Sequence, residues 1–391
     1  MVHLHELNSQ ETKRHPQVFF GQLREGRGPY FVEGLNAWVT TSYEDALFVL
    51  RDPRLTKDRR KLEAARDKVL AEQALEYPHL LLVDPPDHSR LRRLVSKAFT
   101  PKMIEQLRPR IQKITEGLLD AVEGRGHMDL IAEFAYPLPI TVISELLGIP
   151  EEDRSQFRHW TQIFINIEEE PERQQKVIGE FFAYIRHLCE EKRVHPGQDL
   201  MSELVHVEEN GDQLSENELI GMIFLLIVAG HETTVNLIGN GTLALLEHPD
   251  QLQLLRNDPL LLPGAVEELL RYTSPVSLSD ERFALEDIEL HGKTIHRGDQ
   301  VLAALISANS DPRQFEDALR LDITRKENAH LAFGKGMHFC LGAPLARLEG
   351  QTAFGALLRR LPGLRLAVDP EALRWNNNPM LRGLAELPVR F

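Results

Sequence analysis

The sequence predicts a mainly α-helical protein with a minor β portion, folded as a single large domain over residues 1–391. Three observations lead to this class. No internal repeat, low-complexity block or Ser/Gly-rich linker divides the chain. One apolar segment, residues 216–247, contains no proline and is long enough for a helix that crosses a whole domain. Short β-type runs are confined to three zones, near residues 30–40, 280–302 and 364–391.

The composition is that of a soluble globular protein, with 42% apolar and 27% charged residues. The formal charge of −14 argues against a general nucleic-acid binder, because neutralising phosphates requires a basic surface. The N-terminus has no apolar core of signal-peptide length. The most apolar run, residues 220–230, leads directly into His231 and Glu232 and therefore resembles a buried helix. We expect a cytoplasmic protein that does not bind membranes.

Local signals place the elements in order along the chain. Residues 30–40 read as two short strands around a Gly-Leu-Asn turn, and SYEDALFVLRD, residues 42–52, reads as the helix that follows. Ser215 and Glu218 have the spacing of a capping box, in which each side chain satisfies a main-chain N–H of the other residue. The central helix is therefore expected over about 216–247, ending before Pro249.

A cysteine lies among three glycines in AFGKGMHFCLGAPLAR, residues 332–347. A helix is predicted just after Cys340, with Pro344 tolerated in its first turn. A helix N-terminus favours a thiolate, so the sulfur suits a nucleophile, a zinc ligand or a haem ligand. Zinc is disfavoured because no second cysteine is near, and His338 is the only local base for a nucleophile. The other cysteine, Cys189, is expected to be a helix packing residue without a disulfide.

The pattern Phe333-Gly334-x-Gly336-x-His338-x-Cys340-x-Gly342-Ala343 resembles the haem-binding loop of the cytochrome P450 family. The resemblance implies the cytochrome P450 fold, haem b as cofactor, and Cys340 as the axial ligand of the haem iron. It also implies cofactor contacts from other residues of this loop, namely Phe333, Gly334, His338 and Gly342.

A second motif, Ala229-Gly230-His231-Glu232-Thr233-Thr234, is similar to the oxygen-activating segment of the family. Small residues let a flat macrocycle approach the helix, and by resemblance Ala229 contacts the cofactor. Glu232 and Thr233 are the expected catalytic residues, which bring protons from solvent and hold them near the bound oxygen. A metalloprotease HExxH motif is excluded because position 235 is Val.

Two further sets of residues follow from the same resemblance. Glu268 and Arg271 match a buried structural pair of the family, with Arg325 or His330 as its third partner. The cations expected to neutralise the two haem propionates are His88, Arg92, Arg282 and His338.

The implied reaction inserts one oxygen atom of O₂ into a mainly apolar small organic substrate, while a separate ferredoxin or flavodoxin with its reductase supplies electrons. The chain has no GxGxxG motif of its own for a nicotinamide cofactor. Two alternatives stay open: a haem peroxygenase driven by peroxide, and a haem-binding sensor without catalysis.

The substrate itself is not specified by the sequence. The residues expected to line the pocket are aliphatic and include Leu225, Val228, Ala229, Leu278 and Met380. Residues of about 60–85 and 160–190, the roof of the pocket in the family, carry no specificity signal. A basic set is expected to dock the electron donor; it comprises Arg90, Arg93, Lys97, Lys335 and Arg347.

Overall fold

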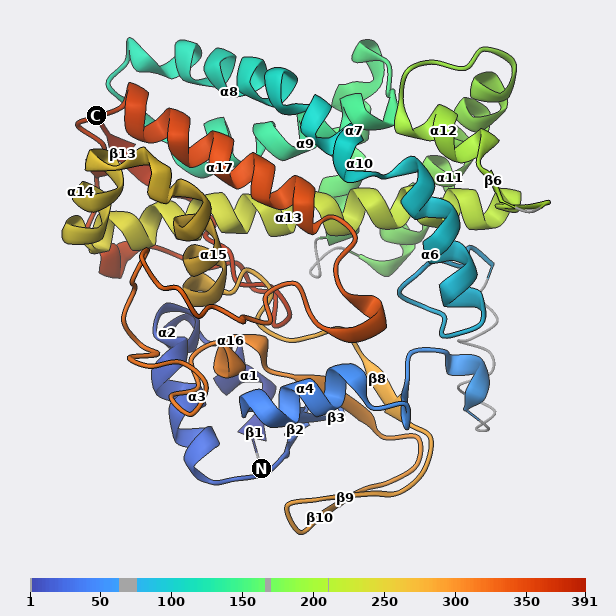
Figure 1. Ribbon diagram of the computed structural model, residues 1–391, viewed down its shortest axis with the longest axis horizontal. Helices are drawn as coiled ribbons and strands as arrows, with labels where there is room; N and C mark the ends of the chain where they lie inside the picture. Colours follow the sequence, from blue (N-terminus) through green and yellow to red (C-terminus); the bar gives the residue numbers. More distant parts are fainter. Residues whose placement is uncertain (1, 63–75, 166–169, 210) are drawn as a thin grey trace. The chain divides into compact units, whose positions relative to one another are not determined.

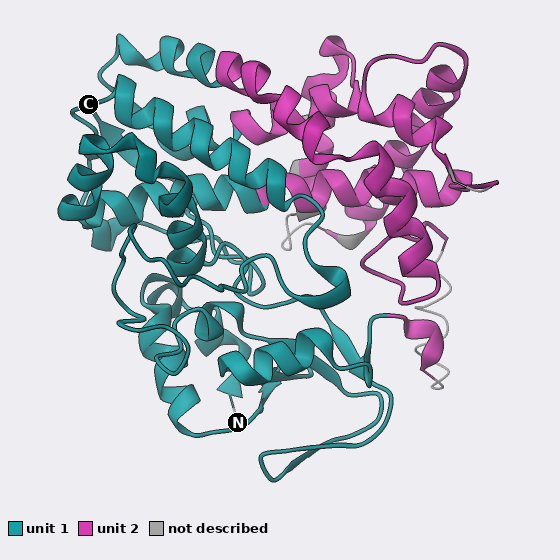
Figure 2. Cartoon of the chain, in the orientation of Figure 1, with its two compact units in different colours: residues 1–57, 115–136, 233–391 teal, residues 58–114, 137–232 magenta. Residues whose placement is uncertain are grey.

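The computed structural model describes residues 2–62, 76–165, 170–209 and 211–391. The chain divides into two compact units, which are coloured separately in Figure 2. Unit 1 contains residues 1–57, 115–136 and 233–391, and unit 2 contains residues 58–114 and 137–232. Because the chain passes between the units four times, no single linker separates them. The prediction of one domain over residues 1–391 stays a prediction.

Unit 1 contains the main sheet, with the strand order β1-β2-β3-β11-β8-β4. The turn between β2 and β3 uses Gly34 and Asn36, whose φ angles of +91° and +50° lie in the left-handed region. Strand β11 pairs in parallel with β3 and antiparallel with β8. The strands are β1 (Val2–His3), β2 (Tyr30–Glu33), β3 (Ala37–Thr40), β4 (Leu55–Thr56), β8 (Arg282–Ala284) and β11 (Gln300–Ala303).

Short helices cover this sheet. Helix α4 is capped by the Ser42 hydroxyl, which accepts a hydrogen bond of 3.0 Å from the Asp45 N–H. Its apolar face, including Ala46 and Val49, is completely buried in one core with Val301 and Ala303 of β11. The helices of this part are α1 (Leu4–Leu7), α2 (Gln10–Arg14), α3 (Pro16–Glu25), α4 (Tyr43–Arg51) and α16 (Leu305–Ala308).

A helical core completes unit 1, and its helices are labelled in Figure 1. Leu237, Val266, Leu269 and Phe354 belong to one buried apolar cluster, so α13, α15 and α17 share a core. The helices are the second half of α13 (Glu216–Glu247), α14 (Pro249–Asn257), α15 (Leu262–Thr273), α17 (Ala343–Arg360) and the end of α8 (Arg108–Glu123). The smaller sheets of the unit are β9-β10 (Ile288–Leu290, Lys293–Ile295) and β12-β13-β5 (Arg365–Leu366, Pro388–Arg390, His127–Asp129).

Unit 2 is almost entirely helical. Its core includes aromatic side chains, with Trp160 packed edge-on against Phe181 at 5.9 Å between ring centroids. The helices are α6 (Asp87–Ala98), α7 (Pro101–Gln106), the start of α8, α9 (Pro137–Leu147), α10 (Arg154–Ile165), α11 (Pro171–Val194), α12 (Leu200–His206) and the first part of α13, with a small hairpin of β6 (Glu208–Glu209) and β7 (Asp212–Gln213).

Helix α13 has the bounds that the sequence predicts, and its capping box is confirmed. The Glu218 carboxylate accepts a hydrogen bond of 2.8 Å from the Ser215 N–H, and the Ser215 hydroxyl accepts one of 3.3 Å from the Glu218 N–H. Among the described helices, α13 alone is long and apolar enough to cross a membrane, and 50% of its apolar window is buried.

Candidate active site

The cysteine loop is closed by main-chain hydrogen bonds. The Cys340 N–H donates to the Phe333 carbonyl at 3.0 Å, and the Gly334 N–H donates to the Leu331 carbonyl at 2.9 Å. Gly334 and Gly336 have φ angles of +69° and +80°, and a Cβ on Gly336 would lie 3.0 Å from the Leu50 carbonyl oxygen. The two glycines are therefore required by the shape of the loop.

The loop leads directly into α17, as predicted. Gly342 is the N-cap residue of this helix, and Pro344 lies in its first turn. The Cys340 side chain is partly exposed. A hydrogen bond from Arg347 to Glu267 is the main cause of a raised pKa of Arg347, and the charge of Cys340 adds to it. Cys340 thus has a helix N-terminus and a guanidinium to stabilise its thiolate.

Cys189 shows the opposite environment. Its side chain is completely buried, and burial raises the pKa of its thiol to about 12. The two cysteines are not joined by a disulfide. Cys189 therefore remains a neutral packing residue, and Cys340 is the sulfur suited to bind a metal.

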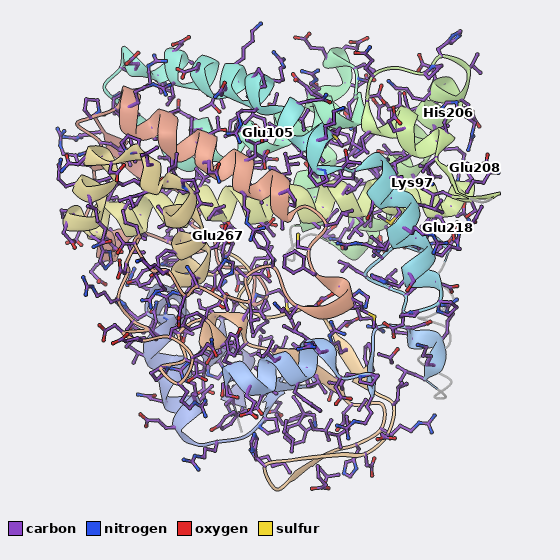
Figure 3. All side chains as sticks on the ribbon, in the orientation of Figure 1. Lys97, Glu105, His206, Glu208, Glu218 and Glu267 are labelled. Carbon is purple, nitrogen blue, oxygen red and sulfur yellow. The ribbon has the colours of Figure 1, made fainter. Side chains whose placement is uncertain are left out.

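Phe333, the first aromatic residue of the loop motif, is held by an ionic cluster that the sequence did not reveal. The Arg347 guanidinium lies over its ring at 4.6 Å and donates two hydrogen bonds of 2.7 Å to Glu267, which is labelled in Figure 3. His330 lies 3.2 Å from the same carboxylate. Burial acts to raise the pKa of Glu267, but the bonds from Arg347 and His330 outweigh it and lower the pKa to about 2.

Glu268 and Arg271 form the expected pair, and both side chains have no exposed surface. The Arg271 guanidinium donates two hydrogen bonds of 2.8 Å to the carboxylate and further bonds to three main-chain carbonyls. Of the two open candidates for the third partner, Arg325 contacts Glu268, at 3.2 Å, whereas His330 contacts Glu267. The cluster ties α15 to the chain just before the cysteine loop.

One stripe of α13 is left uncovered between two buried stretches of the helix, residues 219–223 and 234–245. Ile227 and His231 are buried, whereas Leu225, Val228 and Thr233 are partly exposed and Ala229 is exposed. The stripe is apolar, ends in the polar pair Glu232-Thr233, and extends about 12 Å along the helix axis. A helix face of this composition is suited to lie against a flat apolar group.

The four predicted propionate partners fall in different units. Arg282 is buried in β8 and His338 belongs to the cysteine loop, so both share unit 1 with Cys340 and Thr233. His88 and Arg92 lie on α6 of unit 2, and His88 is buried. Ala229 and Glu232, on α13, also belong to unit 2.

The predicted substrate residues beyond α13 lie in or against the apolar core of the main sheet. Leu278 has no exposed surface and packs in the apolar cluster of the sheet, against which the partly buried Met380 also lies. Their place in a substrate pocket stays a prediction. Within the predicted roof, residues 63–75 and 166–169 lie outside the described residues.

The predicted docking set is partly engaged in contacts within the protein. Arg90 pairs with Asp212 at 3.1 Å and also contacts Glu218. Lys97 is exposed and donates a hydrogen bond of 3.3 Å to the Glu208 carbonyl (Figure 3). Arg347 is bound to Glu267, as described above. Lys335, in the cysteine loop, and Arg93 are exposed.

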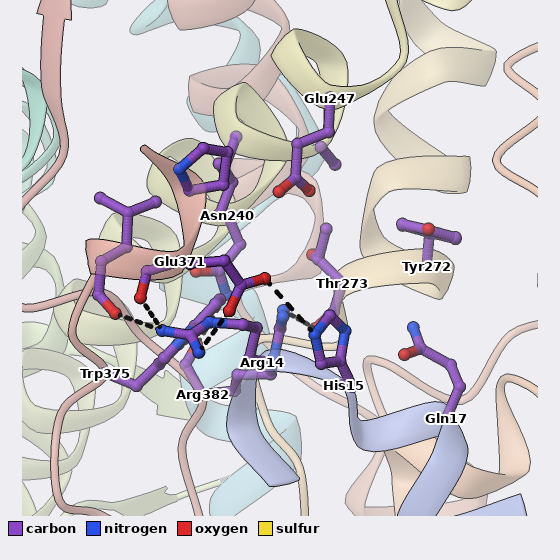
Figure 4. Close-up of a pocket in the computed structure, with 14 residues that line it drawn as sticks. Arg14, His15, Gln17, Asn240, Glu247, Tyr272, Thr273, Glu371, Trp375 and Arg382 are labelled. Atoms are coloured by element: carbon purple, nitrogen blue, oxygen red, sulfur yellow. Dashed lines mark hydrogen bonds and ion pairs between the residues drawn. The ribbon is translucent and has the colours of Figure 1, made fainter. Parts of the chain in front are cut away.

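A separate cavity of about 120 Å³ lies in unit 1 and contains none of the predicted site residues (Figure 4). Arg382 lines it, and burial lowers the pKa of this residue to about 10. Glu247 lines it too, and burial raises the pKa of its carboxyl. Arg14 and Glu371 close one side with an ion pair of 2.9 Å. The cavity is polar, unlike the apolar stripe of α13.

The residues present fit a haem better than a zinc ion. Among the described residues, no three His, Cys, Asp or Glu side chains form a metal-binding group. The cysteine loop instead offers one sulfur at a helix N-terminus, and Arg282 offers a buried guanidinium for a carboxylate. Phe339, the residue before Cys340, is 37% exposed, so the loop presents an apolar surface.

Comparisons with known proteins agree with this donor set. The family model for cytochrome P450 matches residues 140–362. Cytochrome P450 CYP107DY1 of Priestia megaterium is 51% identical over 409 residues, covering 100% of this chain and 99% of the relative. Cytochrome P450 monooxygenase PikC of Streptomyces venezuelae is 49% identical over 362 residues, covering 92% of this chain and 86% of the relative. The crystal structure of myxobacterial cytochrome P450 CYP267B1 in complex with myristic acid has a TM-score of 0.92 and 46% identity, covering 99% of each chain.

The chain belongs to the cytochrome P450 family, and it has the cytochrome P450 fold. It is an oxidoreductase of the monooxygenase class, which uses molecular oxygen.

Proposed function

We propose that this protein is a soluble, cytoplasmic haem-thiolate monooxygenase that inserts one oxygen atom of O₂ into a mainly apolar organic molecule. The observation that carries the proposal is the closed, glycine-dependent loop that holds Cys340 at the start of α17.

The cofactor would be haem b, and the Cys340 thiolate would bind its iron. Bound haem supplies the oxygen-binding and redox chemistry, and a thiolate ligand favours cleavage of the O–O bond. The cysteine loop contributes Phe333, Gly334 and Gly342 around the sulfur. The cations for the propionates are His88, Arg92, Arg282 and His338. The buried position of Arg282 supports this role, because a guanidinium held in a dry site binds a carboxylate strongly.

Glu232 and Thr233 handle protons. Both residues are partly exposed on the uncovered stripe of α13, and the Oε2 atom of Glu232 is buried. Glu232 would bring protons from solvent, and the neighbouring Thr233 hydroxyl would hold them on the face of α13 that also carries Ala229. Replacing Thr233 with Ala removes this hydroxyl, so we expect electron consumption to continue while product per NADPH falls several-fold. Coupling equal to that of the wild type would remove Thr233 from the mechanism.

The substrate is mainly apolar, because the stripe formed by Leu225, Val228 and Ala229 is aliphatic. The myristic acid bound by the myxobacterial relative gives a first compound to test. A shift of the haem spin state on addition of each compound of a library would identify better ligands.

Electrons come from a separate ferredoxin or flavodoxin. Arg93 and Lys97 on α6 and Lys335 in the cysteine loop are exposed cations that support docking of an acidic donor. Arg90 is omitted because it is neutralised by Asp212 and Glu218. Reversing the charge of Arg93 and Lys97 should slow reduction and flatten its dependence on salt, whereas unchanged kinetics would contradict this docking role.

The decisive experiment supplies ¹⁸O₂, NADPH, a surrogate ferredoxin with its reductase, and myristic acid, and analyses the products by mass spectrometry. A monooxygenase forms a product that carries one ¹⁸O atom. A peroxygenase forms product with hydrogen peroxide alone and at least as fast. A sensor binds haem and forms no product under either condition. Each of the last two results would replace the proposed function.

A further inference from the structure

The polar cavity of unit 1 contains a buried cation, Arg382, which is only 9% exposed (Figure 4). Its Nε atom donates a hydrogen bond of 2.6 Å to the Lys13 carbonyl, and its Nη1 atom donates one of 3.3 Å to the Thr273 carbonyl. The guanidinium also lies over the Trp375 ring, 4.0 Å from its centroid. Among the described residues, these contacts include no carboxylate and leave the Nη2 atom without a partner. The cation is therefore held in place but not neutralised.

The guanidinium keeps its charge in this environment. Burial is the main cause that lowers the pKa of Arg382 to about 10, so the group is protonated at neutral pH. Lys13 adds a second cation beside it, because this side chain is 5% exposed and its ammonium donates hydrogen bonds of 2.6 and 3.4 Å to the Asn378 and Leu381 carbonyls. A buried positive charge is unfavourable unless an anion compensates it. The cavity thus favours an anionic ligand.

The unused donors of Arg382 suit a carboxylate. A guanidinium carries five N–H donors and the two main-chain carbonyls use two of them, so three remain for a ligand. The planar group presents its donors in parallel, which matches the two oxygens of a carboxylate. Because Trp375 and the two carbonyls already hold the guanidinium, little conformational freedom would be lost on binding.

The other charges around the cavity limit the charge of the ligand. Besides Arg382, the charged and titratable groups that line it are Arg14, His15, Glu247, Tyr272 and Glu371. Arg14 pairs with Glu371 at 2.9 Å, and His15 lies 4.0 Å from the same carboxylate. Glu247 is exposed, and its charge acts on Arg382 from a distance. Two carboxylates therefore line the cavity, and they repel a doubly charged anion such as phosphate more strongly than a monoanion.

The size of the cavity limits the ligand as well. An engineered cavity of about 150 Å³ is known to hold one benzene molecule, so a cavity of about 120 Å³ has room for a ligand of about four to six non-hydrogen atoms. Acetate and lactate are carboxylates of this size.

We propose that this cavity is a binding site for a small monocarboxylate, whose oxygens accept hydrogen bonds from the Arg382 guanidinium. The bound anion would neutralise Arg382 and connect the C-terminal segment to the ends of α2, α13 and α15 that line the cavity. This inference is independent of the proposed function, because the cavity contains none of the predicted haem or substrate residues.

The first test measures binding to the haem-loaded wild type by isothermal titration calorimetry at neutral pH. The probes are sodium acetate, sodium lactate and inorganic phosphate, with sodium chloride added to keep the ionic strength constant. Ligands of so few atoms should bind with a Kd on the order of 1 mM, and phosphate should bind more weakly than either carboxylate. No heat of binding from the carboxylates far above this concentration, or tighter binding of phosphate, would overturn the proposal.

The second test locates the site with variants. Arg382→Gln should bind neither carboxylate. Glu247→Gln removes a negative charge from the lining of the cavity and should tighten lactate binding several-fold. Glu105→Gln, which removes an exposed acid of unit 2, is the matched control and should keep the wild-type Kd. If Arg382→Gln does not fold, Glu247→Gln still decides. Wild-type affinity in Glu247→Gln, or binding retained by a folded Arg382→Gln, would overturn the proposal.

The third test is a crystal structure of the wild type soaked in lactate. The carboxylate of lactate should lie within hydrogen-bond distance of the Arg382 guanidinium. Lactate bound only at another place would assign the measured heat to a different site and would overturn the proposal.

Discussion

Glu267 on α15 and Glu349 on α17 are both withdrawn from solvent in unit 1, yet their surroundings favour opposite charge states at neutral pH. Burial acts to raise the pKa of each. Glu267 has Arg347 and His330 within hydrogen-bond distance and stays ionised. Glu349 has only the Thr234 hydroxyl as the partner that affects its pKa and stays protonated. Glu267 is 29% exposed and Glu349 is 1% exposed, so the nearby cations and the shallower burial together keep Glu267 ionised.

The two carboxyl groups therefore stabilise the fold in different ways. Around α15, fixed charges clamp the chain that leads to the cysteine loop. Where α17 packs on α13, burial raises the pKa of Glu349, and a threonine hydroxyl rather than a cation is the partner that offsets it. The stabilisation from Glu267 is lost as pH falls towards 2, whereas that from Glu349 is lost as pH rises towards 8.

The largest expected effect follows from breaking the charged arrangement at its most buried point. In Glu268→Ala the Arg271 guanidinium remains buried without its anion, which should lower the free energy of unfolding by about 3–5 kcal/mol. Thermal unfolding and the yield of haem-loaded protein measure this loss. Arg108→Ala, which removes an exposed i,i+3 pair with Glu105, serves as control and should leave the Tm unchanged. Equal Tm values for Glu268→Ala and the wild type would show that the pair does not stabilise the folded protein.

A smaller effect is expected from Arg347→Ala, which removes the main partner of Glu267. The folded-state pKa of Glu267 is depressed from 4.5 to about 2, so its ionised form stabilises the protein above about pH 4.5, and this stabilisation is lost as pH falls towards 2. Because the side chain is 29% exposed, solvent screening limits the effect at pH 7 to about 1–3 kcal/mol. The difference in urea midpoint between wild type and variant should shrink on acidification. A difference that grew towards low pH would have the wrong sign.

The smallest effect concerns a third carboxylate, Glu218, whose role is to cap α13. Ser215→Ala removes the hydroxyl that accepts a hydrogen bond from the Glu218 N–H. The free energy of unfolding should therefore fall by about 1 kcal/mol. Ser215→Asp keeps an acceptor and should stay near the wild-type urea midpoint. A loss as large as that of Glu268→Ala would mean that the capping box supports more than the end of one helix.

Features with a local signature could be predicted from the sequence. The capping box predicted the start of α13, because Ser215 and Glu218 are three residues apart and form two hydrogen bonds with each other. The glycines and Pro344 gave the cysteine loop and the start of α17, because their backbone preferences are fixed by covalent geometry. The pair of Glu268 and Arg271 was expected by resemblance, and its i,i+3 spacing allows it on one helix face.

Features that depend on distant segments could not be predicted. Nothing in the stretch Arg347-Leu348-Glu349-Gly350 marks Glu349 as buried, because its burial depends on α13, more than 100 residues earlier in the sequence. The choice of Arg325 over His330 as third partner of Glu268 depends on how residues 325–330 fold back on α15. The contacts of Arg90 with Asp212 and Glu218 could not be predicted for the same reason, since these partners are 122 and 128 residues away.

The central claim is that the Cys340 sulfur is the axial ligand of a haem iron. Its most direct test is the absorption spectrum of the dithionite-reduced, carbon monoxide-bound protein, recorded for the wild type, Cys340→Ala and Cys189→Ala. We predict the red-shifted Soret band of sulfur ligation in the wild type and in Cys189→Ala, and its loss in Cys340→Ala. A wild-type protein that takes up no porphyrin, or a Cys340→Ala variant that keeps the red-shifted band, would contradict the account.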